Sequence, residues 1–374
     1  MCFINPVFGE EDIRKSENFT DEQIKDLLSR SLPTQPDALE KFMKDENTLS
    51  ISGSIPYLEG EASYDWWLSI DSVAESIHND KAFGKYLYSE GGPIVGYGPM
   101  CEGYIQISIY DEMKGKITTE DIKEMSRIVE KYAEKESIKN IPIFMTYSNI
   151  SGNYTGPLVQ GGNVAATPNL GPGMFAFAVK QNNNSNSKGI ITVAHLIDFN
   201  YNNTNRPVYV NYILPNNLLG YATTINNRID AIYVPYSNVT CMMHIGNNTQ
   251  IKVYTGIDSA SGTLLNRYGT ATGSTTGYLK GFEYDRVWNT GNTTITRTFD
   301  KVGYMNSSTN VSEGGDSGGP IYCGMNITTN GKTSHEALVL GMTFGNSKLN
   351  NEPVSVFVPF REIQDKFNVT LLTN

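Results

Sequence analysis

Residues 312–323 of this chain read Ser-Glu-Gly-Gly-Asp-Ser-Gly-Gly-Pro-Ile-Tyr-Cys, and this stretch decides how the rest is interpreted. Glycines lie on both sides of Ser317, so the backbone can make a sharp turn that exposes the hydroxyl. The amides of Gly315 and Ser317 can then point at one spot, as stabilisation of a developing oxyanion requires. With 35 glycines in the chain, a chance glycine-rich turn is the alternative. The apolar Ile321 and Tyr322 indicate a following strand and favour the first interpretation.

A serine hydroxyl needs a base to accept its proton, and the base needs a carboxylate to orient it. The chain has four histidines. His78 and His335 stand in polar stretches, and His244 stands in an apolar one that predicts a buried strand. His195 ends the apolar run Gly189–His195, which predicts a strand that stops at the histidine. His195 is therefore the predicted base, although a histidine after a strand is also an ordinary polar residue.

Two of these segments resemble one known family. Gly-Asp-Ser-Gly-Gly-Pro at 315–320 closely resembles the nucleophile loop of chymotrypsin-like serine proteases, and Thr-Val-Ala-His at 192–195 resembles their histidine element. The resemblance covers residues 156–366. It implies two antiparallel six-stranded β-barrels with the active site between them. It also implies a serine endopeptidase that forms an acyl-enzyme on Ser317, with His195 as base and an oxyanion hole made by the amides of Gly315 and Ser317.

The chain order of the family places the carboxylate between His195 and Ser317. Asp230 begins Asp-Ala-Ile-Tyr-Val, which resembles the family's Asp-Ile-Ala-Leu strand. A carboxylate beside a buried strand needs hydrogen bonds, and an imidazole N–H supplies one. Asp198, close to His195, and Asp258, in a Gly/Ser-rich loop, are weaker candidates. The alternative function is a catalytically silent protease homologue that binds peptides or a protein partner.

The resemblance implies a tentative substrate pocket made by Val311, Thr343, Phe344 and Gly345. Val311 stands where trypsin-like members carry an acid, so we expect the pocket to accept an apolar or aromatic side chain. The nearby acid Glu313 would change this preference.

Ile94-Val95-Gly96 resembles the N-terminus that trypsin-like proteases gain on activation. It lies too far before His195, and we expect it to begin a strand of the preceding domain. Asp316 then needs an arginine or another amine as its partner, as in bacterial members. Cys241 and Cys323 resemble a pair that bridges two strands of the second barrel; two small buried thiols are the alternative.

Residues 1–150 are predicted to form a smaller α/β domain, and residues 151–374 the protease domain. Apolar spacing predicts a helix over 119–133, strands are predicted at 103–110 and 141–147, and a further helix begins at 21–28. This domain resembles the propeptides of bacterial and archaeal members, which implies an intramolecular partner that keeps a zymogen inactive. A permanent regulatory or partner-binding domain is the alternative. The Gly/Ser/Asn-rich segment 149–156 is the predicted linker and cleavage site.

The composition narrows the classes of partner. A net charge of −10 argues against nucleic-acid binding, and no apolar run is long enough for a membrane span. No residue pattern indicates a metal site or a cofactor, so the expected partner is a protein or peptide substrate. The second half is poor in charge and rich in Asn-x-Ser/Thr triplets, including those at Asn310 and Asn326. These features favour a secreted or cell-surface enzyme, expressed here without a leader.

Overall fold

A computed structural model describes residues 33–148, 151–152, 164–167, 171–196, 206–210, 218–246, 249–257, 263–290, 296–307, 310–329 and 332–373. The helix predicted at 21–28, most of the predicted linker, Asp198 and Asp258 lie outside these residues. The chain divides into two compact units. Unit 1 contains the N-terminal residues through 148 and also Thr263 and Leu279–Trp288, while unit 2 contains the other described residues. Sequence analysis had assigned Leu279–Trp288 to the second domain.

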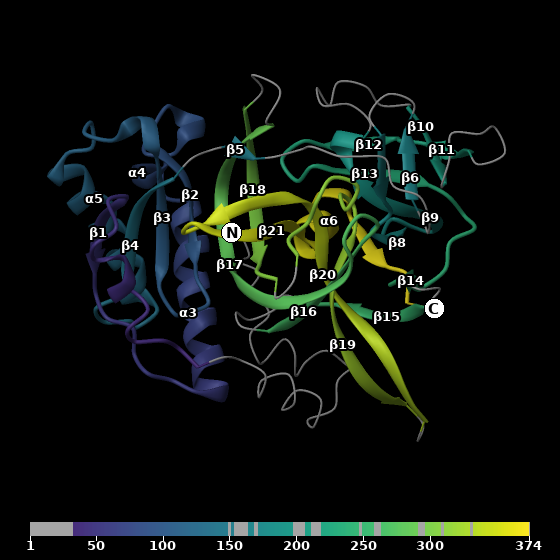
Figure 1. The fold of residues 1–374 in the computed structure, drawn as a ribbon, viewed down its shortest axis with the longest axis horizontal. Helices are drawn as coiled ribbons and strands as arrows, with labels where there is room; N and C mark the ends of the chain where they lie inside the picture. The colour runs from purple at the N-terminus through teal and green to yellow at the C-terminus, as the bar shows by residue number, and fades with distance from the viewer. Residues whose placement is uncertain are drawn as a thin grey trace. The chain divides into compact units, whose positions relative to one another are not determined.

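Unit 1 combines helices with a sheet (Figure 1). Its helices are η1 (Glu40–Phe42), α3 (Gly60–His78), α4 (Lys81–Gly84), η2 (Tyr88–Glu90), η3 (Asp111–Met113) and α5 (Thr119–Lys135). Its strands are β1 (Thr48–Ser52), β2 (Ile94–Pro99), β3 (Ile105–Tyr110) and β4 (Ile143–Ser148), in the order β1-β4-β3-β2, and β2 pairs with β17 (Gly273–Thr290).

The predicted helix and both predicted strands of this region are confirmed as α5, β3 and β4. Thr118 and Asp121 form a capping box at the start of α5, and the apolar face of the helix is buried. β3 and β4 are parallel, with α5 as the crossover between them. Ile94 begins β2 and is fully buried, as expected for a strand residue.

Unit 2 consists mainly of strands. The first are β5 (Ser151–Gly152), β6 (Val164–Thr167), β7 (Gly171–Met174), β8 (Phe177–Gln181), β9 (Asn184–Val193), β10 (Pro207–Val210), β11 (Leu218–Tyr221), β12 (Thr224–Asn226) and β13 (Ala231–Pro235), with η4 (Ala194–Leu196) after β9. The later ones are β14 (Met242–His244), β15 (Gln250–Gly256), β16 (Leu264–Gly269), part of β17, β18 (Thr296–Met305), β19 (Pro320–Thr329), β20 (Lys332–Leu349), β21 (Glu352–Pro359) and β22 (Val369–Leu371), with α6 (Phe360–Phe367) before β22. The predicted last helix is confirmed as α6.

Two sheets form the earlier part of unit 2. One has the order β12-β13-β9-β8-β22, and the other has the order β11-β10-β6-β7. β9 and β13 are antiparallel neighbours in register from Val193↔Ala231 to Gly189↔Pro235. This register brings the end of β9 to the start of β13, where the predicted base and its carboxylate stand.

The later strands pair in a closed ring. β16 pairs with β17 and β19, β20 pairs with β19 and β21, and β18 pairs with β17 and β21. Alternate side chains of this ring fill its interior, among them Leu265, Ile321 and Val356, which are fully buried. β19 and β20 continue beyond the ring as a long hairpin (Figure 1). No helix within the described ranges has the length and apolar character to cross a membrane.

Candidate active site

The loop before β19 carries Ser317 and depends on two glycines in left-handed conformations. Gly315 has a φ of 101° and Gly318 a φ of 88°. A Cβ atom on Gly318 would lie 1.9 Å from the carbonyl oxygen of Met174, so a larger residue has no room there. The amide of Gly318 donates to the carbonyl of Thr343 at 2.7 Å, and the amide of Thr343 donates to the carbonyl of Gly319 at 2.8 Å. These bonds fix the loop on β20.

His195 and Asp230 lie together at the adjacent ends of β9 and β13. Nδ1 of His195 is 2.5 Å from Oδ2 of Asp230, and the His195 amide donates to Oδ1 at 2.9 Å. The Asp230 carbonyl accepts from the Ala194 amide at 2.8 Å. Asp230 is fully buried and has a φ of 44°, a strained conformation for a residue with a side chain. The carboxylate therefore holds both the main chain and the ring of His195.

Met174, the last residue of β7, joins this pair to the serine loop. Its carbonyl accepts from Oγ1 of Thr192, three residues before His195, at 2.5 Å. Its amide donates to the carbonyl of Ser317 at 2.6 Å. One residue thus bridges the strand that ends at His195 and the loop that carries Ser317.

Gly173 gives a second measure of how near the two elements lie. A Cβ atom built on Gly173 would be 2.3 Å from Cδ1 of Leu196 and 2.8 Å from the carbonyl oxygen of Ser317. The residue after His195 and the predicted nucleophile therefore contact the same glycine. Ser317 is 9% exposed, and its Oγ lies 3.4 Å from the carbonyl oxygen of Phe344.

Asp316 is held by a buried arginine from β16. Nη1 of Arg267 is 2.8 Å from Oδ2 of Asp316, and both side chains are fully buried. Burial lowers the pKa of the Arg267 guanidinium, and the charge of Asp316 opposes that shift. The expectation that Asp316 uses an arginine is confirmed. Ile94, the other partner considered, lies within a strand of unit 1.

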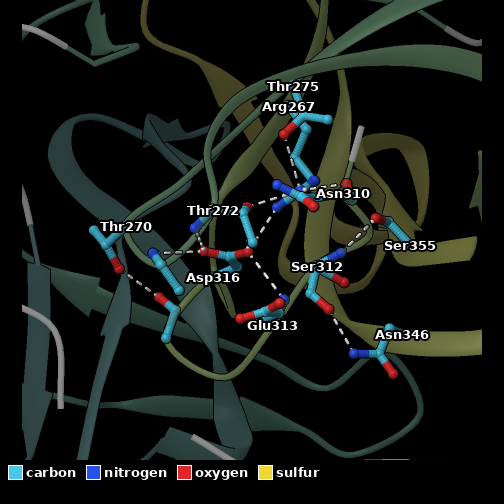
Figure 2. Close-up of polar contacts among 12 residues, drawn as sticks. Arg267, Thr270, Thr272, Thr275, Asn310, Ser312, Glu313, Asp316, Asn346 and Ser355 are labelled. Carbon is cyan, nitrogen blue, oxygen red and sulfur yellow. Dashed lines mark hydrogen bonds and ion pairs between the residues drawn. The ribbon is translucent and has the colours of Figure 1, made fainter. Parts of the chain in front are cut away.

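Figure 2 shows that the turn between β16 and β17 completes the surroundings of Asp316. Its Oδ1 accepts from the amides of Ala271 at 2.8 Å and Thr272 at 3.2 Å, and its Oδ2 accepts from Oγ1 of Thr272 at 2.7 Å. Oγ1 of Thr270 donates to the carbonyl of Gly315 at 2.8 Å. The turn therefore holds Gly315 and Asp316, the two residues directly before Ser317.

Sequence analysis did not identify Arg267 as the arginine that holds Asp316, although a signal was present. Leu265 and Arg267 alternate inward on β16 while Leu264 points outward. An arginine on the inward face of an apolar strand requires a buried acid, and Asp316 of the glycine-rich motif was available.

The four predicted pocket residues differ in burial. Thr343 and Phe344 are fully buried, and the Phe344 ring stacks on Phe299 at 4.8 Å between centroids. Val311 and Gly345 are partly exposed. Ser312 connects the two segments. Its Oγ donates to the carbonyl of Gly345 at 2.5 Å. Its carbonyl accepts from Nδ2 of Asn346 at 2.5 Å (Figure 2). Between them, only Val311 and Gly345 offer surface to a ligand.

The expected bridge between Cys241 and Cys323 is wrong. No disulfide joins the two thiols. Cys323 of β19 is buried, and a buried thiol packs as a small apolar side chain. Within the ranges that the structure describes, no group of His, Cys, Asp and Glu side chains gathers as the ligands of a metal ion would.

The comparisons with known proteins concern the fold. No model of a protein family matches the sequence, and the curated proteins likewise contain no match. Solved structures similar to this chain include Thermobifida fusca protease A (20% identity, 58% of this chain and 100% of that chain, TM-score 0.41). Cellulomonas bogoriensis chymotrypsin is similar at 18% identity over 58% of this chain and 99% of that chain, with a TM-score of 0.41. Nocardiopsis protease is similar at 17% identity over 58% of this chain and 100% of that chain, with the same TM-score.

These structures carry the names of chymotrypsin-like serine proteases, the family that the two sequence motifs resemble. Identities of 20% or less and TM-scores near 0.4 assign no activity to this chain. The functional case therefore depends on its own residues, above all on the contacts of His195, Asp230 and the loop of Ser317.

Proposed function

We propose that the chain is a serine endopeptidase. Oγ of Ser317 attacks the carbonyl carbon of a peptide bond while His195 accepts its proton, and the imidazolium returns that proton to the leaving amine. Water then attacks the acyl carbonyl while His195 accepts its proton, and the imidazolium returns that proton to Oγ of Ser317 as the ester bond breaks and the carboxylic acid leaves. Asp230 orients the ring and stabilises its charged form.

The observation that carries this proposal is the direct contact of the His195 ring with Asp230, beside a strand that also binds the serine loop. A histidine whose Nδ1 is held by a buried carboxylate presents Nε2 as the free base. The amides of Gly315 and Ser317 are the proposed oxyanion donors, which act only when the loop is rigid. Arg267 supports this stabilisation of the oxyanion, because it holds Asp316, the residue between Gly315 and Ser317.

The expected substrate is a protein or peptide whose apolar side chain lies against Val311 and Gly345. We further propose that residues 151–374 form two barrels, of which the closed ring of later strands is the second. A charge-poor surface with exposed Asn310 and Asn326 supports an exported enzyme. Inhibition by the N-terminal region remains a prediction, tested by the peptidase activity of the chain before and after a cut beyond Gly152.

The test compares the full chain with its Ser317→Ala variant. We expect the wild type to cleave a mixed peptide library and to be labelled by a serine-directed phosphonate. The variant should lose labelling and at least about 10⁴-fold of its turnover while it unfolds at the same urea concentration. Ser69→Ala, on α3 of unit 1, is the matched control and should keep both. A folded wild type that is neither active nor labelled, before or after the cut, would instead identify a silent homologue.

A further inference from the structure

The sheet of unit 1 contains a strand that the chain supplies from far beyond its N-terminal region. The segment Leu279–Trp288 of β17 lies in unit 1, whereas the residues on both sides of it lie in unit 2. Tyr284 pairs with Tyr97 of β2 in antiparallel register, and the amide of Cys101 donates to the carbonyl of Lys280 at 2.6 Å. The N-terminal residues alone therefore leave β2 with a neighbour on one side only, which is β3.

Both faces of this segment are covered, as in the interior of a sheet. All residues from 281 to 288 are buried. The ring of Phe282 packs against Trp67 of α3 with centroids 5.8 Å apart, and Val287 packs with Val95 of β2. The main chains of the segment and of β2 also approach each other closely. A Cβ atom on Gly98 would lie 2.2 Å from the carbonyl oxygen of Phe282. A strand that is buried on both faces belongs to the core of its domain.

Charged side chains of Leu279–Trp288 bind polar and charged groups of the N-terminal residues. Glu283 is fully buried, accepts from Oγ of Ser108 at 2.6 Å and pairs with Arg286 at 3.3 Å. Asp285, which lies between them, has a φ of 48°, in the left-handed region. Further pairs are Lys280 with Glu102 at 2.9 Å, Asp285 with His78 at 2.8 Å and the hydroxyl of Tyr284 with Asp71 at 3.2 Å.

These contacts make separation costly. If the N-terminal residues left, Glu283 and Arg286 would lose Ser108 and their covering, and Glu102 would lose Lys280. A buried charge that loses its partner is strongly destabilising. Burial raises the pKa of Glu102, but the charge and hydrogen bond of Lys280, together with hydrogen bonds from the Cys101 thiol and the main chain, lower it overall.

We infer that the N-terminal region and the segment Leu279–Trp288 form one folding unit that a backbone cut does not separate. The N-terminal region is then a permanent part of the protein, completed by a strand that belongs covalently to the other fragment. This differs from a propeptide that leaves after cleavage, and it holds whether or not the chain is a peptidase.

The test uses the full chain as Ser317→Ala, so that no self-cleavage interferes, with the recognition sequence of a specific protease inserted between Gly152 and Val164. After cutting, gel filtration without denaturant should show both fragments in one peak of the mass of the intact chain. They should separate only in urea that also unfolds unit 1, as judged by tryptophan fluorescence. Separation of folded fragments without denaturant would overturn the inference.

The strand contacts are tested by Glu283→Gln in the same cut protein. Loss of this charge should lower the urea concentration that separates the fragments by roughly 1–2 M. Glu120→Gln removes an exposed charge that pairs with Lys123 on α5, and it should cause no shift. If Glu283→Gln yields no folded protein, Lys280→Met, at the less buried pair with Glu102, replaces it. An unchanged separation point in the folded variant would show that these contacts do not hold the fragments together.

Discussion

Two buried ion pairs lie close in sequence and serve different parts of the molecule. Arg267 and Asp316 join a strand of unit 2 to the loop of Ser317, whose glycines adopt left-handed conformations. Glu283 and Arg286 lie on β17 within unit 1, and Glu283 binds Ser108 of β3, the strand beyond its neighbour β2. The first pair holds a loop in a shape that the backbone would not choose by itself. The second satisfies charges inside a regular sheet.

The difference shows what each pair is expected to control. Main-chain bonds hold the loop at Ser317, Gly318 and Gly319, but its shape before Ser317 also depends on the groups that hold Asp316. A central strand has its ladder, so the loss of a side-chain pair lowers stability and leaves the geometry elsewhere unchanged. We therefore expect the first pair to affect both activity and stability, and the second to affect stability alone.

The largest effect is expected from Arg267→Met. Asp316 would remain buried without its cation, and the free energy of unfolding should fall by about 3–5 kcal/mol. Because the Gly315 amide would lose its position, kcat/KM for a peptide should fall by at least about 10²-fold at a temperature where the variant is folded. Urea unfolding and peptide kinetics measure the two effects. Arg361→Met, at the exposed pair with Asp365 on α6, should change either by little. Normal activity in Arg267→Met would show that the loop needs no such support.

Glu283→Gln should separate stability from activity. The substitution removes the carboxylate that pairs with Arg286 inside the sheet, and the free energy of unfolding should fall by about 3–5 kcal/mol. At low temperature, where the variant stays folded, kcat/KM should equal that of the wild type. A fall in kcat/KM of the size expected for Arg267→Met would mean that the two regions are not independent.

Thr270→Val tests the loop more gently. It removes the hydroxyl that binds the Gly315 carbonyl and keeps the shape of the side chain. A hydrogen bond of this kind contributes about 1 kcal/mol, so we expect kcat to fall about tenfold or less with KM unchanged. Thr270→Ser should restore kcat. An equal change in KM would indicate that Thr270 acts on substrate binding instead.

The smallest effect concerns acid stability in unit 1. Burial alone would raise the pKa of Asp80, but hydrogen bonds from Tyr132, Lys131 and the amides of Ala82 and Phe83 lower it from 3.8 to about 2. A lowered carboxyl pKa stabilises the folded state above pH 3.8, and this stability is lost as the pH falls towards 2. In Asp80→Asn, this pH dependence should disappear and stability at pH 7 should fall by about 1 kcal/mol. Urea unfolding at several pH values measures both, and a pH dependence that survives in the variant would exclude Asp80 as its source.

Much of the local structure follows from the sequence. The apolar spacing of 119–133 marked α5, and the run that ends at His195 marked the end of β9, because both patterns reflect the repeat of the element itself. The pairing of His195 with Asp230 also lay within reach, since each residue stands at the end of an apolar run.

Other features depended on contacts between distant segments. The bridge expected between Cys241 and Cys323 is absent, because two cysteines pair only where the fold brings their Cβ atoms together. The same limit applies to Arg267, whose partner lies in a loop, and to Met174, which connects the serine loop with β9.

The sequence by itself determined which side chains carry the proposed chemistry and which segments form α5, β3 and β4, because both depend on neighbours along the chain. Only the tertiary structure decided which arginine holds Asp316 and that Leu279–Trp288 belongs with the N-terminal residues. A strand shows its own period in the sequence, but its neighbours in the sheet depend on which surfaces bury each other when the whole chain folds.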